Sequence, residues 1–199
     1  LPGTPNHGAP PDPPGPPALW RRLAGLAPQQ LVWIAGSTHR GEESAVLDAH
    51  VAARAVRPDL ALVIAPRHPE RVGEVMSLVT ARGFDVVRRS ELPGRSLDPA
   101  ATVIVLDTVG ELAQLYSIAD VVFVGGSLAP FGGHNMLEPA TRAKPVLFGP
   151  HTTNFREAAA LLLDGGGARL VGDGRELRGE VVRFLTDPHL RATYAGTIG

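Results

Sequence analysis

The chain has 199 residues, of which 44% are hydrophobic and 20% are charged, a composition typical of one globular domain. Its 19 Lys and Arg residues nearly balance its 20 Asp and Glu residues, so it lacks the overall positive charge that nucleic-acid binding needs. The absence of Cys excludes disulfides and thiolate metal sites, and no apolar run approaches the roughly 20 residues of a membrane span.

The first residues differ in composition from the rest. Residues 1–17, LPGTPNHGAPPDPPGPP, consist mainly of Pro and Gly, which favour an extended, polyproline-like segment. We therefore expect an interdomain linker at 1–19 and a single folded domain at 20–199.

From residue 31 onward, short apolar runs alternate with amphipathic stretches. Strands are predicted at 31–35, 60–65, 84–88, 102–106, 121–124 and 145–148, and helices at 42–56, 69–82, 110–118, 135–142, 154–164 and 175–186. This alternation predicts an α/β fold, with a Rossmann-like, doubly wound parallel sheet buried on both faces. Ligands of such sheets bind beyond the carboxyl ends of the strands, so the loops that follow the strands are the candidate site.

The loop after the strand at 121–124 contains two glycine pairs, at 125–126 and 132–133. Glycine lets the backbone turn sharply and approach a ligand closely, and free N–H groups at the following helix start favour an anion. Glu138 lies one turn into that helix, where its carboxylate can accept hydrogen bonds from both hydroxyls of a ribose. An ordinary strand-to-helix connection with an exposed Glu is the alternative.

The strand at 60–65 is followed by Pro66-Arg67-His68-Pro69. The two prolines stiffen a short turn that places the Arg67 guanidinium at the strand end, where it can bind phosphate or carboxylate in a bidentate manner. The alternative is a surface arginine that caps a neighbouring helix or pairs with Glu70.

The strand at 102–106 leads into Val109-Gly110-Glu111. Gly110 can present backbone groups to the edge of a base, and Glu111 suits the first turn of a helix. The alternative is a plain helix start with an acidic first turn.

Three further groups of polar residues follow strands. The segment 36–43 is a candidate for binding the transferred sugar or the acceptor, although Ser37 or Thr38 could equally cap a helix. His134 could brace the glycine loop or reach the donor, and His151 could be structural. We assign no role to Arg40.

Together these segments resemble the 3-deoxy-D-manno-octulosonic acid (Kdo) transferases. The segments that carry the resemblance are WIAGSTHRGEE at 33–43, APRHPERV at 65–72, VGELAQLYSIADVVFVGGS at 109–127, and GGSLAPFGGHNMLEP followed by GPHTTNFREA at 125–158. Four motifs in the right order are far more specific than any one of them. The resemblance covers roughly residues 31–160.

The resemblance implies one half of a two-domain (GT-B type) glycosyltransferase, which moves Kdo from CMP-Kdo to a lipid A precursor in lipopolysaccharide biosynthesis. This chain would be the C-terminal, donor-binding half, in which Arg67 contacts the phosphate of CMP and the main chain at 109–111 recognises the pyrimidine. The donor-binding residues expected on this basis are Pro66, Arg67, Val109, Gly110, Glu111, Asn135, Met136, Leu137 and Glu138. Family members often have Met at position 109 and Pro at position 40, where this sequence has Val and Arg.

The resemblance also implies what this half would lack. The catalytic base would be a Glu of the N-terminal domain, so we expect no catalytic residue in this chain and no transfer by the isolated fragment. No Asp-x-Asp or His-rich ligand motif is present, so we expect no metal cofactor. The full-length protein would act at the cytoplasmic face of the bacterial inner membrane and would contact the membrane only through segments outside this chain.

Three other classes of protein remain open on the sequence. A nucleotide-sugar epimerase or a uridine-donor glycosyltransferase of the same two-domain architecture would share Glu138 and the glycine loop. A non-catalytic nucleotide-binding module would bind CMP without a partner domain. An interaction domain that uses the Pro-rich start as a peptide ligand would bind no nucleotide.

Overall fold

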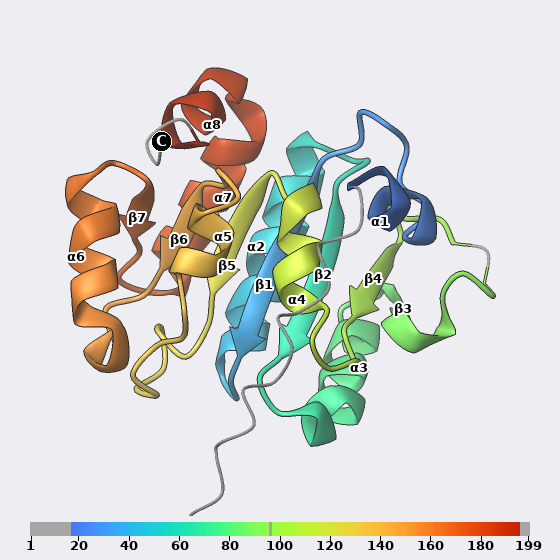
Figure 1. The fold of residues 1–199 in the computed structure, drawn as a ribbon. Coiled ribbons are helices and arrows are strands. Elements are labelled where there is room, and N and C mark those ends of the chain that lie inside the picture. Colours follow the sequence, from blue (N-terminus) through green and yellow to red (C-terminus); the bar gives the residue numbers. More distant parts are fainter. Residues whose placement is uncertain (1–16, 96, 196–199) are drawn as a thin grey trace, which may run out of the picture.

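The computed structural model describes residues 17–95 and 97–195. The linker expected at 1–19 lies outside these residues except for its last three, which begin helix α1 (Pro17–Leu23). The described part is an α/β domain with helices on both faces of one sheet (Figure 1). None of its helices is long and apolar enough to cross a membrane.

The sheet has seven parallel strands in the order β3-β4-β2-β1-β5-β6-β7. The strands are β1 (Val32–Thr38), β2 (Ala61–Pro66), β3 (Asp85–Arg88), β4 (Thr102–Val105), β5 (Val121–Val124), β6 (Val146–Phe148) and β7 (Ala168–Leu170). All six predicted strands are confirmed, five of them to within one residue at each end, while β1 ends three residues later than predicted. Strand β7 was missed because a three-residue edge strand has too short an apolar run to be recognised.

The remaining helices are α2 (Glu42–Val56), α3 (Val72–Ala81), α4 (Leu112–Leu115), α5 (Leu137–Ala140), α6 (Arg156–Asp164), α7 (Gly174–Thr186) and α8 (Pro188–Ala195). The prediction for α2 is confirmed at both ends. The helices predicted at 110–118 and 135–142 are wrong in length, because the first is one α-turn followed by the 3-10 turn η3 (Tyr116–Ile118), and the second is the four-residue α5. Helices α1 and α8 were not predicted.

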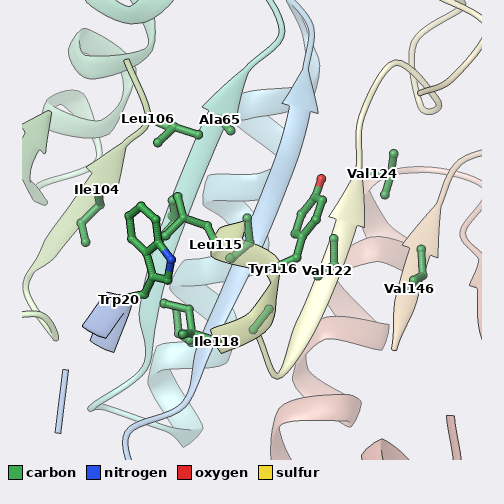
Figure 2. Packing of buried hydrophobic residues seen from close by; sticks show 14 of the residues in the cluster. Trp20, Ala65, Ile104, Leu106, Leu115, Tyr116, Ile118, Val122, Val124 and Val146 are labelled. Atoms are coloured by element: carbon green, nitrogen blue, oxygen red, sulfur yellow. The ribbon is translucent and has the colours of Figure 1, made fainter. Parts of the chain in front are cut away.

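Two separate apolar layers hold the helices against the sheet. On one face α1, α4, α5 and α6 cover the sheet, where Trp20 of α1, Leu115 of α4 and Tyr116 of η3 pack on the central strands (Figure 2). On the other face α2, α3 and α7 pack on side chains such as Trp33 and Phe123. Because both faces are covered, all four residues of β5 are buried, which explains its unbroken apolar sequence.

The strand order reverses between β1 and β5. From β1 the chain moves outward through β2 to the edge strand β3 and to β4, and then returns to the other side of β1 to form β5. In doubly wound sheets the crevice at such a switch point, beyond the carboxyl ends of the strands, is where ligands bind. The fold therefore places the candidate site over the ends of β1 and β5.

Candidate functional site

The loops that follow β1, β2 and β5 are joined at the carboxyl edge of the sheet by main-chain hydrogen bonds. The N–H of Arg67 donates to the carbonyl of Thr38 at 2.9 Å, and the N–H of Gly125 donates to the carbonyl of Gly36 at 2.8 Å. A Cβ at position 125 would lie 2.4 Å from the Ser37 carbonyl oxygen, so only Gly allows β5 to approach β1 this closely. Backbone hydrogen bonds thus hold the three segments of the site together.

A pocket of about 230 Å³ opens between the ends of β2 and β4. It is lined by Ser37, Ala65, Pro66, Arg67, Pro69, Leu106, Thr108, Val109, Gly110 and Leu112. Four of the residues expected to bind the donor therefore meet here, although they come from two loops about forty positions apart. Ser37, at the end of β1, has a φ of 53°, a strained conformation of the kind that gathers at ligand sites.

Arg67 is an exposed side chain on the wall of this pocket. Within the described residues its guanidinium forms no hydrogen bond or ion pair, so the alternative pairing with Glu70 is not formed. Its five N–H donors are thus available to an anion in the pocket.

The second wall of the pocket comes from the loop before α4. Val109 is 87% exposed, and Gly110 has a φ of 85°. The carboxylate of Glu111 is not free, since it pairs with the Arg89 guanidinium at 3.1 Å and accepts a hydrogen bond from the Thr108 hydroxyl. A base bound here would therefore meet the main chain and the Val109 side chain rather than the Glu111 carboxylate.

The expected ribose-binding segment lies at the start of α5. Glu138 is exposed. Burial raises the pKa of the Tyr116 hydroxyl, and the negative charge of Glu138 raises it further. The Asn135 side chain accepts a hydrogen bond from the N–H of Leu137 at 3.1 Å, and Met136 is fully buried in the core. Of these four residues, only Glu138 presents a free charged side chain, and Met136 could reach a ligand only through its backbone.

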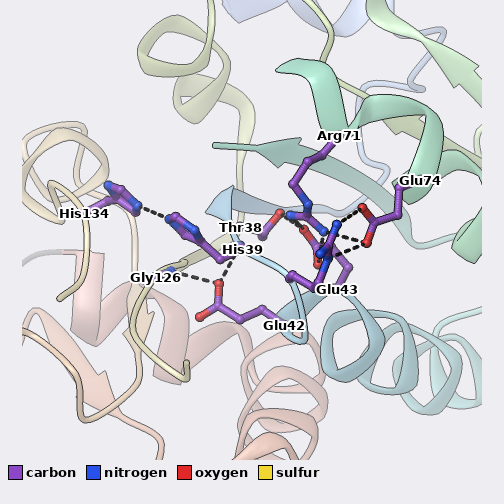
Figure 3. A network of polar contacts seen from close by, with 9 residues as sticks. Thr38, His39, Glu42, Glu43, Arg71, Glu74, Gly126 and His134 are labelled. Atoms are coloured by element: carbon purple, nitrogen blue, oxygen red, sulfur yellow. Dashed lines mark hydrogen bonds and ion pairs between the residues drawn. The ribbon is translucent and has the colours of Figure 1, made fainter. Parts of the chain in front are cut away.

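The N–H groups of the segment that begins at the first glycine pair are not free to bind a ligand. Glu42, the first residue of α2, is 1% exposed, and its carboxylate accepts hydrogen bonds from five backbone N–H groups. Figure 3 shows those from His39 and Gly126. The donors are His39, Gly126, Ser127, Leu128 and Ala129, at 2.8–3.3 Å. An internal carboxylate thus takes the N–H groups at 126–129, which precede the helix start where we expected an anionic ligand. With α5 only four residues long, the expected helix-dipole attraction is also weak.

A second buried carboxylate ties α2 to the segment after β2. Glu43 is fully buried, accepts two hydrogen bonds from the Arg71 guanidinium at 2.7 and 3.2 Å, and accepts another from the Thr38 hydroxyl (Figure 3). Arg71 also contacts Glu74, which pairs with Arg40 at 3.0 Å. The hydrogen bonds from these two arginines, Arg40 first, lower the pKa of Glu74 to about 2. Arg40, to which we assigned no role, therefore belongs to a surface ion-pair network.

Ser127 joins the glycine loop to the end of β6. Its hydroxyl donates to the Val124 carbonyl at 2.6 Å and accepts from the N–H of Gly149 at 2.9 Å. Its own carbonyl accepts from the N–H of His151 at 2.9 Å. His151 thus helps to fix the loop through its backbone.

A second, larger pocket of about 550 Å³ lies between α5 and the start of α6. It is lined by Leu137, Thr153, Asn154, Phe155, Arg156, Glu157, Ala158 and Leu161. Of the residues expected to bind the donor, it contains only Leu137. The smaller pocket, with Arg67 at its wall, is therefore the better candidate for an anionic nucleotide.

Comparisons with known proteins show which family the chain resembles. A curated 3-deoxy-D-manno-octulosonic acid transferase of Haemophilus influenzae is 45% identical over 135 residues, which are 67% of this chain and 31% of that protein. The chain thus spans about a third of the length of this relative. No family model matches the sequence.

Two solved structures share the fold. The crystal structure of the C-terminal CMP-Kdo binding domain of WaaA from Acinetobacter baumannii has a TM-score of 0.81 and 32% identity, covering 91% of this chain and 93% of that one. The structure of Anabaena HepE in complex with UDP-glucose has a TM-score of 0.63 and 19% identity, and covers 91% of this chain and 46% of that one. The second supports the Rossmann-like fold alone. The chain is 45% identical to the Haemophilus transferase and 32% identical to the Acinetobacter domain, and it therefore belongs to the 3-deoxy-D-manno-octulosonic acid transferase family.

Proposed function

We propose that this chain is the donor-binding half of a glycosyltransferase that moves Kdo from CMP-Kdo to a lipid A precursor in lipopolysaccharide biosynthesis. Membership of the family supports the reaction, and the relative in the Acinetobacter structure is described as a CMP-Kdo binding domain. The single observation that carries the proposal is the Arg67 guanidinium, which has no ion-pair partner among residues 17–95 and 97–195, on the wall of a pocket lined by Pro66, Val109 and Gly110.

The nucleotide would lie along the carboxyl edge of the sheet. The cytosine would contact the main chain at 109–111, the phosphate would meet Arg67, and the ribose hydroxyls would donate to Glu138. As the bond between the sugar and the phosphate breaks, negative charge grows on CMP, and a fixed guanidinium stabilises it. This role of Arg67 requires no metal ion, and we propose none for this half.

The acceptor hydroxyl must lose a proton during transfer. In this proposal the general base is a Glu of an N-terminal domain, as the family resemblance implies, and the chain described here binds the donor without catalysing transfer. Contact with the acceptor and with the cytoplasmic face of the inner membrane would also belong to segments outside this chain.

Arg67→Ala and Glu138→Ala should each weaken CMP binding without loss of folding. Removing the Arg67 guanidinium deletes charge-assisted hydrogen bonds to phosphate, so we expect an affinity about 10- to 100-fold lower, and about 10-fold lower for Glu138→Ala. Calorimetric titration with CMP measures both effects, with UMP as competitor.

Arg22→Ala is the matched control, because Arg22 is exposed on α1, at the opposite end of the sheet (Figure 1). It should leave CMP affinity unchanged. Equal binding of UMP and CMP would favour a uridine-donor enzyme, whereas unchanged CMP affinity in Arg67→Ala would contradict the proposed phosphate contact.

A further inference from the structure

Three imidazoles gather at the switch point of the sheet, each from a different loop. His39 follows β1, His68 follows β2, and His134 lies in the loop after β5. The Nε2 atoms of His39 and His134 are 2.7 Å apart, with ring planes parallel within 2° (Figure 3). His68 meets His39 edge-on at 5.4 Å between ring centroids. We call His39, His68 and His134 the imidazole cluster.

The surrounding chain holds this cluster in place. The Phe131 ring, which is 47% exposed, stacks on His39 with centroids 4.1 Å apart, while His39 itself is only 7% exposed. A Cβ at position 126 would lie 2.8 Å from the Cδ2 atom of His134, so Gly126 makes the room that this ring occupies. The backbone N–H of His39 is fixed by Glu42. The rings are therefore positioned by three loops at once.

The short contact between His39 and His134 defines where their protons lie. When both rings are neutral, one donates its Nε2–H and the other accepts, so the accepting ring carries its proton on Nδ1. Burial lowers the pKa of His134 to about 4, with further lowering by His39, Arg67 and His68. The pair is thus neutral at pH 7 and can gain a proton when an anion arrives.

The charged and titratable groups that face His39 come from two parts of the chain, α2 and the segment after β2. Burial lowers the pKa of His39. The carboxylates of Glu42 and Glu43 in α2 oppose this shift, whereas His68 and Arg71, which follow β2, lower the pKa further. Both carboxylates are already engaged, Glu42 by backbone N–H groups and Glu43 by Arg71. The Arg71 guanidinium offsets the charge of Glu43, whereas Glu42 keeps its negative charge and favours a proton on His39.

We propose that the imidazole cluster, next to Arg67, is the subsite for the carboxylate of the transferred sugar. The inference rests on the proposed function, since the carbon that leaves the phosphate of CMP-Kdo also bears a carboxylate. Two anions must therefore be bound side by side, and Arg67 at the pocket wall supplies the counter-charge for one of them. The N–H groups at 126–129 are taken by Glu42, and the imidazole N–H groups of the cluster are the donors that we assign to the second anion.

The test compares two ligands that differ in the sugar and its carboxylate. Calorimetry in the cold measures binding of CMP-Kdo and of the methyl ester of CMP, a phosphodiester of the same charge at phosphorus. We expect CMP-Kdo to bind at least about tenfold tighter. In His134→Ala that ratio should fall to about one, while methyl-ester affinity changes less than about twofold. His189→Ala, an exposed His on α8, is the matched control and should keep the wild-type ratio.

A second readout separates binding from a merely structural role. Titration in buffers of different ionisation enthalpy should show proton uptake on binding CMP-Kdo, no uptake with the methyl ester, and none with either ligand in His134→Ala. A wild-type affinity ratio of one, or a ratio that survives in His134→Ala, would overturn the subsite but leave the nucleotide site standing. No binding of either ligand by the folded wild-type chain would overturn the proposed function and this inference with it.

Discussion

Glu42→Gln lowers the free energy of unfolding by about 3–5 kcal/mol, because a buried carboxylate that satisfies several N–H groups is replaced by an amide with one acceptor oxygen. In the structure the two carboxylate oxygens accept from the five N–H groups at 2.8–3.3 Å, and the residue is 1% exposed. The amide nitrogen of Gln would face donors, leaving buried N–H groups without partners. Chemical denaturation of the wild type and the variant measures this difference.

Glu157→Gln is the matched control for this substitution. Glu157 also lies in the first turn of a helix, α6, but it is exposed, so its replacement should change stability by less than about 0.5 kcal/mol. Equal stability of Glu42→Gln and Glu157→Gln would mean that the glycine loop does not depend on the buried carboxylate.

The wild-type chain should lose stability faster than His50→Gln as the pH falls from 7 to 4. His50 is 1% exposed in α2, where its Nδ1 accepts a hydrogen bond from the Trp33 indole N–H at 3.1 Å. Burial, followed by the charge of Arg54, lowers its pKa to about 3. The His side chain is neutral in the folded protein, while the unfolded chain takes up a proton below its ordinary pKa of about 6.5.

Because the unfolded state binds more protons between these two pKa values, His50 contributes stability above pH 6.5 that is lost as the pH falls toward 3. The loss is about 1.4 kcal/mol per pH unit below 6, or about 3 kcal/mol between pH 7 and pH 4. Gln can accept the Trp33 hydrogen bond but does not titrate, so its stability curve should lack this component.

Urea unfolding at a series of pH values measures both curves. His189→Gln, at an exposed position, should run parallel to the wild type. Parallel curves for the wild type and His50→Gln would show that His50 is protonated in the folded protein as readily as in the unfolded chain.

The sequence predicted the fold well where the signal is local. Unbroken apolar runs marked the strands, and the helix predicted at 42–56 matches α2 at both ends. The helices predicted at 110–118 and 135–142 are longer than α4 and α5, because a helical sequence pattern does not reveal that the chain leaves the helix after one turn. The edge strand β7 is too short to give a pattern.

The candidate site was predicted where its residues follow strands. The grouping of Arg67 with Val109 and Gly110 follows from the rule that the carboxyl ends of parallel strands share one edge. Four of the five N–H partners of Glu42 lie 84–87 residues later in the chain, and His39 and His134 are 95 residues apart. No local pattern pairs residues at such separations, so these contacts required the structure.

The most direct test of the donor-binding proposal is a crystal structure of the chain with CMP. We predict cytosine against the main chain at 109–110, phosphate within hydrogen-bond distance of Arg67, and ribose hydroxyls on Glu138. CMP bound instead in the larger pocket between α5 and α6, without contact to Arg67, would contradict the proposed site.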